Sequence, residues 1–136
     1  MTLIISGGEI MKEIINTPNA PKPIGPYSQG VKIDKLLFIS GQIPIDPATG
    51  SLVLSGVEAQ TRRAMDNIKA ILESCGAKMD NIVKTTIYLK RIDDFKFVNE
   101  VYEKYFSSGF PARAVIEVSN LPKKVDVEIE AIAVLD

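Results

Sequence analysis

The chain has 136 residues, of which 46% are hydrophobic and 24% are charged, and these proportions are typical of one globular domain with a hydrophobic core. Its 16 basic and 17 acidic residues give a net charge of −1, which offers no broad basic face for nucleic acid. The lack of histidine excludes the usual Cys/His zinc sites and any triad with a histidine base, and the single cysteine excludes an internal disulfide.

The first ten residues are separated from the rest of the chain by a second methionine, Met11. They are either an additional edge strand or an extension upstream of a natural start at Met11. We favour the extension for residues 1–10 and interpret residues 11–136 as a single domain. The chain has no basic secretion leader and no apolar run of about 20 residues, so we expect a cytoplasmic protein.

A loop with four prolines between Pro18 and Pro26 comes next. Proline fixes φ and removes a backbone donor, so this segment is predicted to be a stiff loop rather than a strand. It leads into a strand predicted over residues 27–33, which begins with Tyr27. The tyrosine is equally consistent with a packed residue whose hydroxyl is satisfied and with a site residue.

Residues 36–45 form the most apolar strand of the first half, and Ser40 and Gly41 interrupt it. A glycine inside a strand often marks a bulge or a close approach of the backbone. Residues 46–50 are predicted to be a turn that leads back through residues 51–54.

Two helices are predicted from apolar residues that recur every three to four positions. The spacing of Ser55 and Glu58 matches a capping box and predicts the start of the first helix, and Gly76 is suited to its end. The second helix is predicted to begin after Asp93 or Asp94 and carries an aromatic-rich stripe, which we interpret as core. Between the helices, residues 82–90 alternate between apolar and polar side chains, as a half-exposed strand does.

The C-terminal part of the chain predicts two strands, one opening with Arg113 and the other carrying Glu128 near its start. Antiparallel pairing of these strands would bring the two charges into one region, although the register is open. An ordinary ion pair on a sheet is the competing interpretation. The second strand becomes apolar on both of its faces after Glu128.

The order of elements predicts an α+β fold in which two helices pack on one face of a mixed β-sheet. Since the helices cover only one face, the apolar residues of the other face predict oligomerisation through the sheet.

The chemistry available is limited to one arginine and a few carboxyl and neutral polar groups, because no phosphate-binding glycine loop, metal cluster or activated nucleophile is present in the sequence. The candidates are Arg113, Glu117, Glu128, Glu130, Tyr27, Ser40 and Gln42. A guanidinium holds a planar carboxylate well, and a neighbouring carboxylate can orient or deprotonate water. This combination suits hydrolysis of a small, anionic, electrophilic substrate, although the residues alone favour a structural Arg–Glu pair.

Four segments then carry a resemblance to a known family: IGPYSQG (24–30), FISGQIPIDPATG (38–50), FPARAVIEV (110–118) and LPKKVDVEIEAIAVLD (121–136). Together they resemble the Rid family, the YjgF-type reactive-intermediate deaminases, from about Met11 to Asp136. The resemblance implies a chorismate-mutase-like fold assembled as a homotrimer with clefts between subunits. It also implies hydrolysis of 2-aminoacrylate, 2-iminopropanoate and 2-iminobutanoate to 2-oxo acids and ammonia, which protects pyridoxal-phosphate enzymes, and it implies no cofactor and no metal.

The resemblance also implies roles for individual residues. Arg113 matches the arginine that clamps the substrate carboxylate, and Glu128 matches the carboxylate that positions the attacking water. Tyr27, Ser40 and Asn99 match residues of the cleft, and Gln42 ranks below them.

One position departs from the family pattern. Many members carry a cysteine two residues after the arginine, where this chain has Val115. A valine keeps the backbone N–H, so we expect activity to survive unless a thiol is essential.

Two other functions are weighed against hydrolysis. Relatives described as single-strand-specific ribonucleases or translation inhibitors suggest a nucleic-acid function, which the near-neutral charge and the missing histidine disfavour. A non-catalytic trimer that binds small 2-oxo acids is the other, and tight binding without turnover would identify it.

Overall fold

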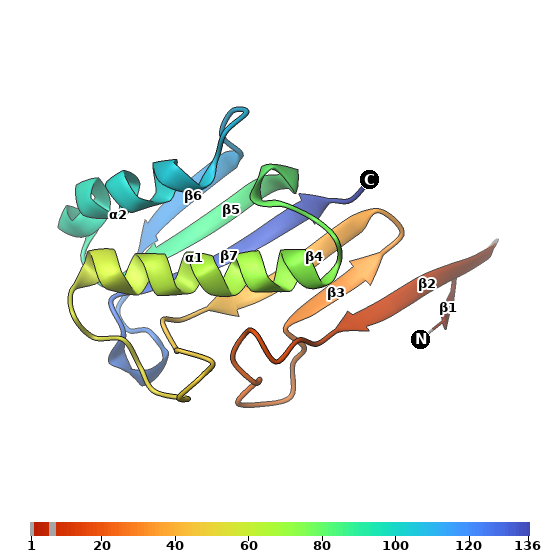
Figure 1. Cartoon of the computed structure of the whole chain (residues 1–136), viewed down its shortest axis with the longest axis horizontal. Coiled ribbons are helices and arrows are strands. Elements are labelled where there is room, and N and C mark those ends of the chain that lie inside the picture. Colours follow the sequence, from red (N-terminus) through yellow and green to blue (C-terminus); the bar gives the residue numbers. More distant parts are fainter. Residues whose placement is uncertain (1, 6–7) are drawn as a thin grey trace.

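The computed structural model describes residues 2–5 and 8–136, with side chains from residue 12 onward, and it shows one mixed sheet with two helices against it (Figure 1). The strands of the described ranges are β1 (Thr2–Ile5), β2 (Gly8–Ile15), β3 (Gly30–Ile33), β4 (Leu36–Gln42), β5 (Ile82–Leu89), β6 (Ala112–Glu117) and β7 (Val127–Val134). Their spatial order is β1-β2-β3-β4-β7-β5-β6, and only β5 and β6 are parallel. The helices are α1 (Val57–Ser74) and α2 (Phe95–Tyr102), so the predicted mixed sheet with two helices is confirmed.

The two C-terminal strands do not pair with each other, and the expectation that they would is wrong. β7 lies between β4 and β5 and is antiparallel to both, whereas β6 lies at the sheet edge on the far side of β5. The helix α2 carries the chain from β5 to β6, which is the connection that parallel neighbours require. The central place of β7 buries the most apolar strand between two neighbours.

The helix α1 packs its apolar stripe on the sheet, with Met65, Ile68 and Leu72 fully buried. The helix ends as predicted at Gly76, which has φ +73°, and the N–H groups of Gly76 and Ala77 bond to the carbonyls of Glu73 and Leu72. Its start was predicted wrongly. Gly56 rather than Ser55 is the N-cap residue, with φ 103° and no side-chain capping bond.

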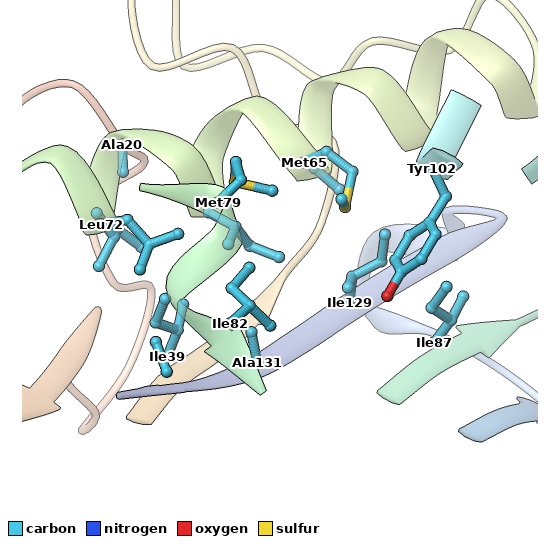
Figure 2. Close-up of a cluster of buried hydrophobic side chains, with 14 of the residues drawn as sticks. Ala20, Ile39, Met65, Leu72, Met79, Ile82, Ile87, Tyr102, Ile129 and Ala131 are labelled. Carbon is cyan, nitrogen blue, oxygen red and sulfur yellow. The ribbon is translucent and has the colours of Figure 1, made fainter. Parts of the chain in front are cut away.

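The core lies between the helices and the sheet (Figure 2). Side chains from both helices meet side chains from three strands there; Figure 2 labels Met65, Leu72 and Tyr102 from the helices and Ile39, Ile82, Ile87, Ile129 and Ala131 from the strands. In β5 the alternation predicted from residues 82–90 holds for Thr85, Ile87 and Leu89, which are buried. A register shift between Ile82 and Lys84 leaves Val83 exposed, contrary to prediction.

The sheet face opposite the helices carries large exposed apolar side chains. They come from the four strands β2, β4, β6 and β7: Ile14, Leu36, Phe38, Ile116 and Val134. Phe38, for example, is 42% exposed and stands opposite Ile132 of β7. The prediction of a second apolar face is therefore confirmed, and we call this surface the open face.

The N-terminal segments differ in part from the predictions. β1 pairs antiparallel with β2 at the sheet edge, so backbone within residues 1–10 is in strands, while residues 1, 6 and 7 lie outside the described ranges. The strand predicted from Tyr27 begins at Gly30, and residues 51–54 contribute only an isolated bridge between Ile45 and Leu52. No helix in the ranges 2–5 and 8–136 has the length and apolar character needed to cross a bilayer.

Candidate active site

Arg113 lines a cavity of about 400 Å³ on the helix side of the sheet. The other residues that line it come from α2 and from the segment before β6: Asn99, Tyr102, Glu103, Phe110 and Pro111. The Cζ atom of Arg113 lies 4.9 Å from the ring centroid of Tyr102 and 5.4 Å from that of Phe95. Two aromatic rings therefore support the guanidinium through cation–π contacts and leave its N–H groups available for a ligand.

The ring of Tyr102 is itself fixed in place. Its hydroxyl is 2.8 Å from Oγ1 of Thr85, and the residue is buried. Burial is the main cause that raises the pKa of Tyr102, while the hydroxyl of Thr85 and the charge of Arg113 act in the opposite direction. The tyrosine is therefore a neutral platform for Arg113.

Glu128 lines a second cavity, of about 710 Å³, at the other face of the sheet. Its lining comes from the proline-rich loop, β4, the loop before β7 and β7 itself: Ile24, Gly25, Pro26, Tyr27, Ser40, Gly41, Ile43, Pro122, Lys123, Glu128 and Glu130. Glu128 is partly buried, and its pKa is raised, first by burial and second by the charge of Glu130. A carboxyl group in this condition is suited to exchange protons with water.

The carboxyl group of Glu128 lies against the backbone of Gly41. A Cβ atom added to Gly41 would be 2.1 Å from Oε2 of Glu128 and 2.9 Å from its Cδ, which is closer than real contacts allow. The predicted close approach at this glycine is therefore present, and its partner is the side chain of Glu128. The register of β4 against β7 also shifts between Ile39 and Gln42, as the prediction of a bulge required.

Tyr27 and Ser40 lie in the same cavity as Glu128. The hydroxyl of Tyr27 accepts a hydrogen bond from the backbone N–H of Ile24, at 3.3 Å, and the side chain is half exposed. The hydroxyl of Ser40 donates to the carbonyl of Ser28, at 2.5 Å, so it presents its lone pairs to other partners. Three predicted residues, Tyr27, Ser40 and Glu128, are thus brought together.

A buried glutamine holds the loop that presents Tyr27. Gln29 is 2% exposed, and its Nε2 donates to the carbonyls of Thr17, Ala20 and Pro21 at 2.9–3.2 Å. Its Oε1 accepts from the N–H of Thr17 at 2.7 Å. These bonds satisfy loop carbonyls that the prolines leave without strand partners, and they explain why the loop is ordered.

The remaining predicted residues are placed apart from Glu128. Asn99 lines the first cavity with Arg113. Val115 follows on β6 and packs against the core, level with Ile87. Gln42 lines neither cavity: it is 5% exposed, pairs with Ile129, and donates to the carbonyl of Ser40 at 3.2 Å. Contact of Gln42 with a substrate stays a prediction.

Arg113 and Glu128 lie on opposite faces of the sheet within one chain. Arg113 is level with Thr85 of β5, which is buried under the helices, and Glu128 is level with Tyr88. Thr85 and Tyr88 are an odd number of residues apart, so their side chains point to opposite faces. The expectation that strand pairing would bring the two charges into one region is wrong for a single protomer.

Three residues near the two cavities were not among the predicted site residues. Tyr102 belongs to the aromatic stripe interpreted as core, Tyr88 lies on the polar side of the alternating strand, and Lys123 was given no role. The signal for Tyr88 was that alternation, which puts its hydroxyl on the open face. Within the part of the chain that the structure describes, no group of three Cys, Asp or Glu side chains is arranged to hold a metal ion.

Comparison with known proteins gives consistent matches. A family model described as Endoribonuclease L-PSP matches residues 17–135. A RutC family protein of Pyrococcus horikoshii is 57% identical over 123 residues, covering 90% of this chain and 98% of that protein. A 2-iminobutanoate/2-iminopropanoate deaminase of Escherichia coli is 50% identical over 127 residues, covering 91% and 98%.

A solved structure agrees with these matches. The crystal structure of E. coli TdcF with bound serine has a TM-score of 0.88 and 42% identity to this chain, and the match covers 91% of this chain and 99% of that one. The arrangement of sheet and helices described above is therefore shared with a protein that holds a small amino acid.

Proposed function

Because this chain belongs to the endoribonuclease L-PSP family, which is the YjgF-type Rid family, we propose that it hydrolyses small reactive 2-imino and 2-enamino acids to 2-oxo acids and ammonia. The family resemblance drawn from the four motifs is confirmed. The observation that carries the proposed activity is the division of the required chemistry between two cavities. One holds a supported guanidinium, and the other holds a partly buried carboxyl group.

The proposed substrates are 2-aminoacrylate, 2-iminopropanoate and 2-iminobutanoate. The E. coli relative is named for the two imino acids, and TdcF binds serine, whose carboxylate and small side chain resemble theirs in size and charge. The Pyrococcus relative carries only the RutC name. The protein would act in the cytoplasm and remove reactive products of pyridoxal-phosphate enzymes such as threonine dehydratase.

The proposed assembly is a chorismate-mutase-like homotrimer with its clefts between subunits. Arg113 and Glu128 of one chain face away from each other, so a complete site requires the helix-side cavity of one protomer against the open-face cavity of another. A heterologous contact joins two different surfaces in this way and closes into a ring. The apolar side chains of the open face supply the area that such a contact would bury.

In the proposed reaction, Arg113 binds the substrate carboxylate with two parallel hydrogen bonds. The rings of Tyr102 and Phe95 keep the guanidinium in place before the substrate arrives. The backbone near Val115 supports the bound carboxylate, and Tyr27 orients the complex from the other side. Positioning and the exclusion of bulk water supply most of the rate enhancement, because a protonated imine is already electrophilic.

Glu128 accepts and donates protons in the proposed reaction. It accepts one proton from water as the oxygen of that water forms a bond to C2, and a carbinolamine results. It then returns the proton to the nitrogen, and the C–N bond breaks as the hydroxyl oxygen forms the C=O bond and passes its own proton to the departing ammonia. One protonated imine and one water thus give one 2-oxo acid and one ammonium ion.

The proposal is tested by coupling the purified protein to threonine dehydratase and threonine and measuring the formation of 2-oxobutanoate. We expect acceleration over the uncatalysed rate, and a loss of about 100-fold or more in Arg113→Ala because the clamp is removed. Arg91→Ala is the matched control, since Arg91 is exposed and lines neither cavity.

An uncatalysed rate with the intact protein would refute the activity. An Arg113→Ala variant as active as the Arg91→Ala control would refute the role of the clamp. Sedimentation tests the trimer, and mixing Arg113→Ala with Glu128→Ala protomers tests the shared cleft. Mixed trimers would contain some intact clefts, so activity should reappear if one cleft uses both chains.

A further inference from the structure

Two carboxyl groups, rather than one, line the open-face cavity. Glu128 and Glu130 are alternate residues of β7, so both point to the open face and their Cα atoms are roughly 7 Å apart. Both are partly buried. The mechanism above uses Glu128 and leaves Glu130 without a role.

Glu130 is held by a phenol group from the neighbouring strand. The hydroxyl of Tyr88 donates a hydrogen bond to Oε1 of Glu130. Tyr88 stands directly opposite Glu128 in the register of β5 and β7 and reaches Glu130 diagonally. The hydrogen bond to Glu130, then burial, then the charges of Glu130 and Glu128 raise the pKa of Tyr88 to about 12, so the hydroxyl remains a donor wherever carboxyl groups titrate.

Glu128 is confined by the backbone of the other neighbouring strand. Its carboxyl group occupies the space where any side chain at Gly41 would begin. Glu130 is therefore held by the hydroxyl of Tyr88 on β5, and Glu128 lies against the backbone of Gly41 on β4. Because the hydrogen bond from Tyr88 keeps the carboxyl group of Glu130 beside Glu128, the repulsion between the two groups persists while that bond is made.

We propose that Glu130 and Tyr88 are positioning residues that set the protonation of Glu128, with Glu130 supplying a fixed negative charge and Tyr88 holding that charge in place. This proposal rests on the proposed function, because Glu128 must both accept and return a proton. A fixed negative charge beside Glu128 favours its protonated form and so retains the proton that the nitrogen needs. The raised pKa of Glu128, for which Glu130 is the second cause after burial, agrees with this role.

Other charged or titratable groups around Glu128 are the same in every variant compared. Tyr27 and Lys123 line the cavity, with Lys123 exposed at its rim. In the proposed assembly, Arg113 of the adjacent protomer also faces the cavity. A difference between the wild-type protein and a substitution at Glu130 or Tyr88 therefore reports on the proposed pair.

The test measures two properties of Glu130→Gln and Tyr88→Phe: the pH dependence of 2-oxobutanoate formation and the NMR titration of the Glu128 side-chain carbon, assigned with Glu128→Gln. In Glu130→Gln, we expect the midpoint for Glu128 and the acidic limb of kcat to move to lower pH, because a negative charge is lost. In Tyr88→Phe, we expect a smaller shift in the same direction, because Glu130 stays charged but loses its tether. Glu73→Gln, an exposed residue at the end of α1, should leave both curves unchanged.

The two proposals fail in distinguishable ways. Unchanged titration midpoints in folded Glu130→Gln protein would overturn the positioning role even if the wild-type protein is fully active. A midpoint that shifts only in Glu130→Gln would overturn the part assigned to Tyr88. If no protein turns over the imine, the proposed function fails, and the carbon titration still decides whether Glu130 and Tyr88 set the protonation of Glu128.

Discussion

Gly41→Ala is predicted to lower activity strongly while changing stability little. A Cβ atom at this position would lie 2.1 Å from Oε2 of Glu128, whereas real Cβ contacts essentially never fall below 3.0 Å. The carboxyl group must therefore move by about 1 Å or more, and because it is the end of a flexible side chain, it can do so without unfolding the strand. A misplacement of about 1 Å in a reacting group costs roughly 10²-fold in rate, or about 2.7 kcal/mol of transition-state stabilisation.

The measurement combines steady-state kinetics in the dehydratase-coupled assay with urea denaturation. We expect kcat to fall by about 10- to 100-fold and the free energy of unfolding to change by less than about 1 kcal/mol. In a Glu128→Ala background, the same glycine substitution should cost almost nothing more, because the two residues act as one unit. Unchanged kinetics in Gly41→Ala, or a full additional loss in the double variant, would refute the reasoning.

Three further substitutions test other features of the structure. Glu128→Gln should abolish activity yet stabilise the protein at neutral pH. The folded-state pKa of Glu128 is raised, so the native state binds more protons than the unfolded state. The stability of the wild-type protein therefore falls as the pH rises from the ordinary pKa of 4.5 through the raised pKa of the folded state. Chemical denaturation at several pH values would show whether the variant lacks this loss of stability. Lys124→Gly should raise the free energy of unfolding by about 0.5–1 kcal/mol, since Lys124 has φ 58°, and a lower thermal midpoint would contradict this. Gln29→Ala should cost about 2–3 kcal/mol through the loss of its loop hydrogen bonds, which urea titration measures, and an unchanged midpoint would show that the loop does not depend on them.

Local patterns were sufficient to predict most elements, because side-chain periodicity reports directly which face of an element is buried. The stripe of α1 and the glycine at its end were both recovered, and so was the turn at residues 46–50. The N-cap residue was not predicted correctly, because the spacing of Ser55 and Glu58 is the same whether or not the backbone forms a capping box there. Gly56, at φ 103°, turns the chain one residue later.

Strand neighbours could not be predicted from the same patterns. Alternation along β7 identifies Ile129 as buried but does not say whether β5 or β6 lies beside it. That choice depends on how the whole sheet buries its most apolar strand, which is a property of contacts far apart in the sequence. For this reason the motifs singled out Arg113 and Glu128, each of which lines a cavity, but the placement of the two on opposite faces followed only from the observed register.

The central place of β7 has a consequence for how the protein is made. β7 leaves the ribosome after the other strands described above, yet it joins β4 on one side to β5 on the other. Until Val127–Val134 emerges, the nascent chain holds two separate strand groups with unpaired edges and an uncovered helix stripe. Such intermediates are prone to aggregation, and sheets closed by distant contacts fold slowly. The sheet is thus expected to be completed only after β7 has emerged, and nascent chains stalled before β7 should be the ones that bind chaperones.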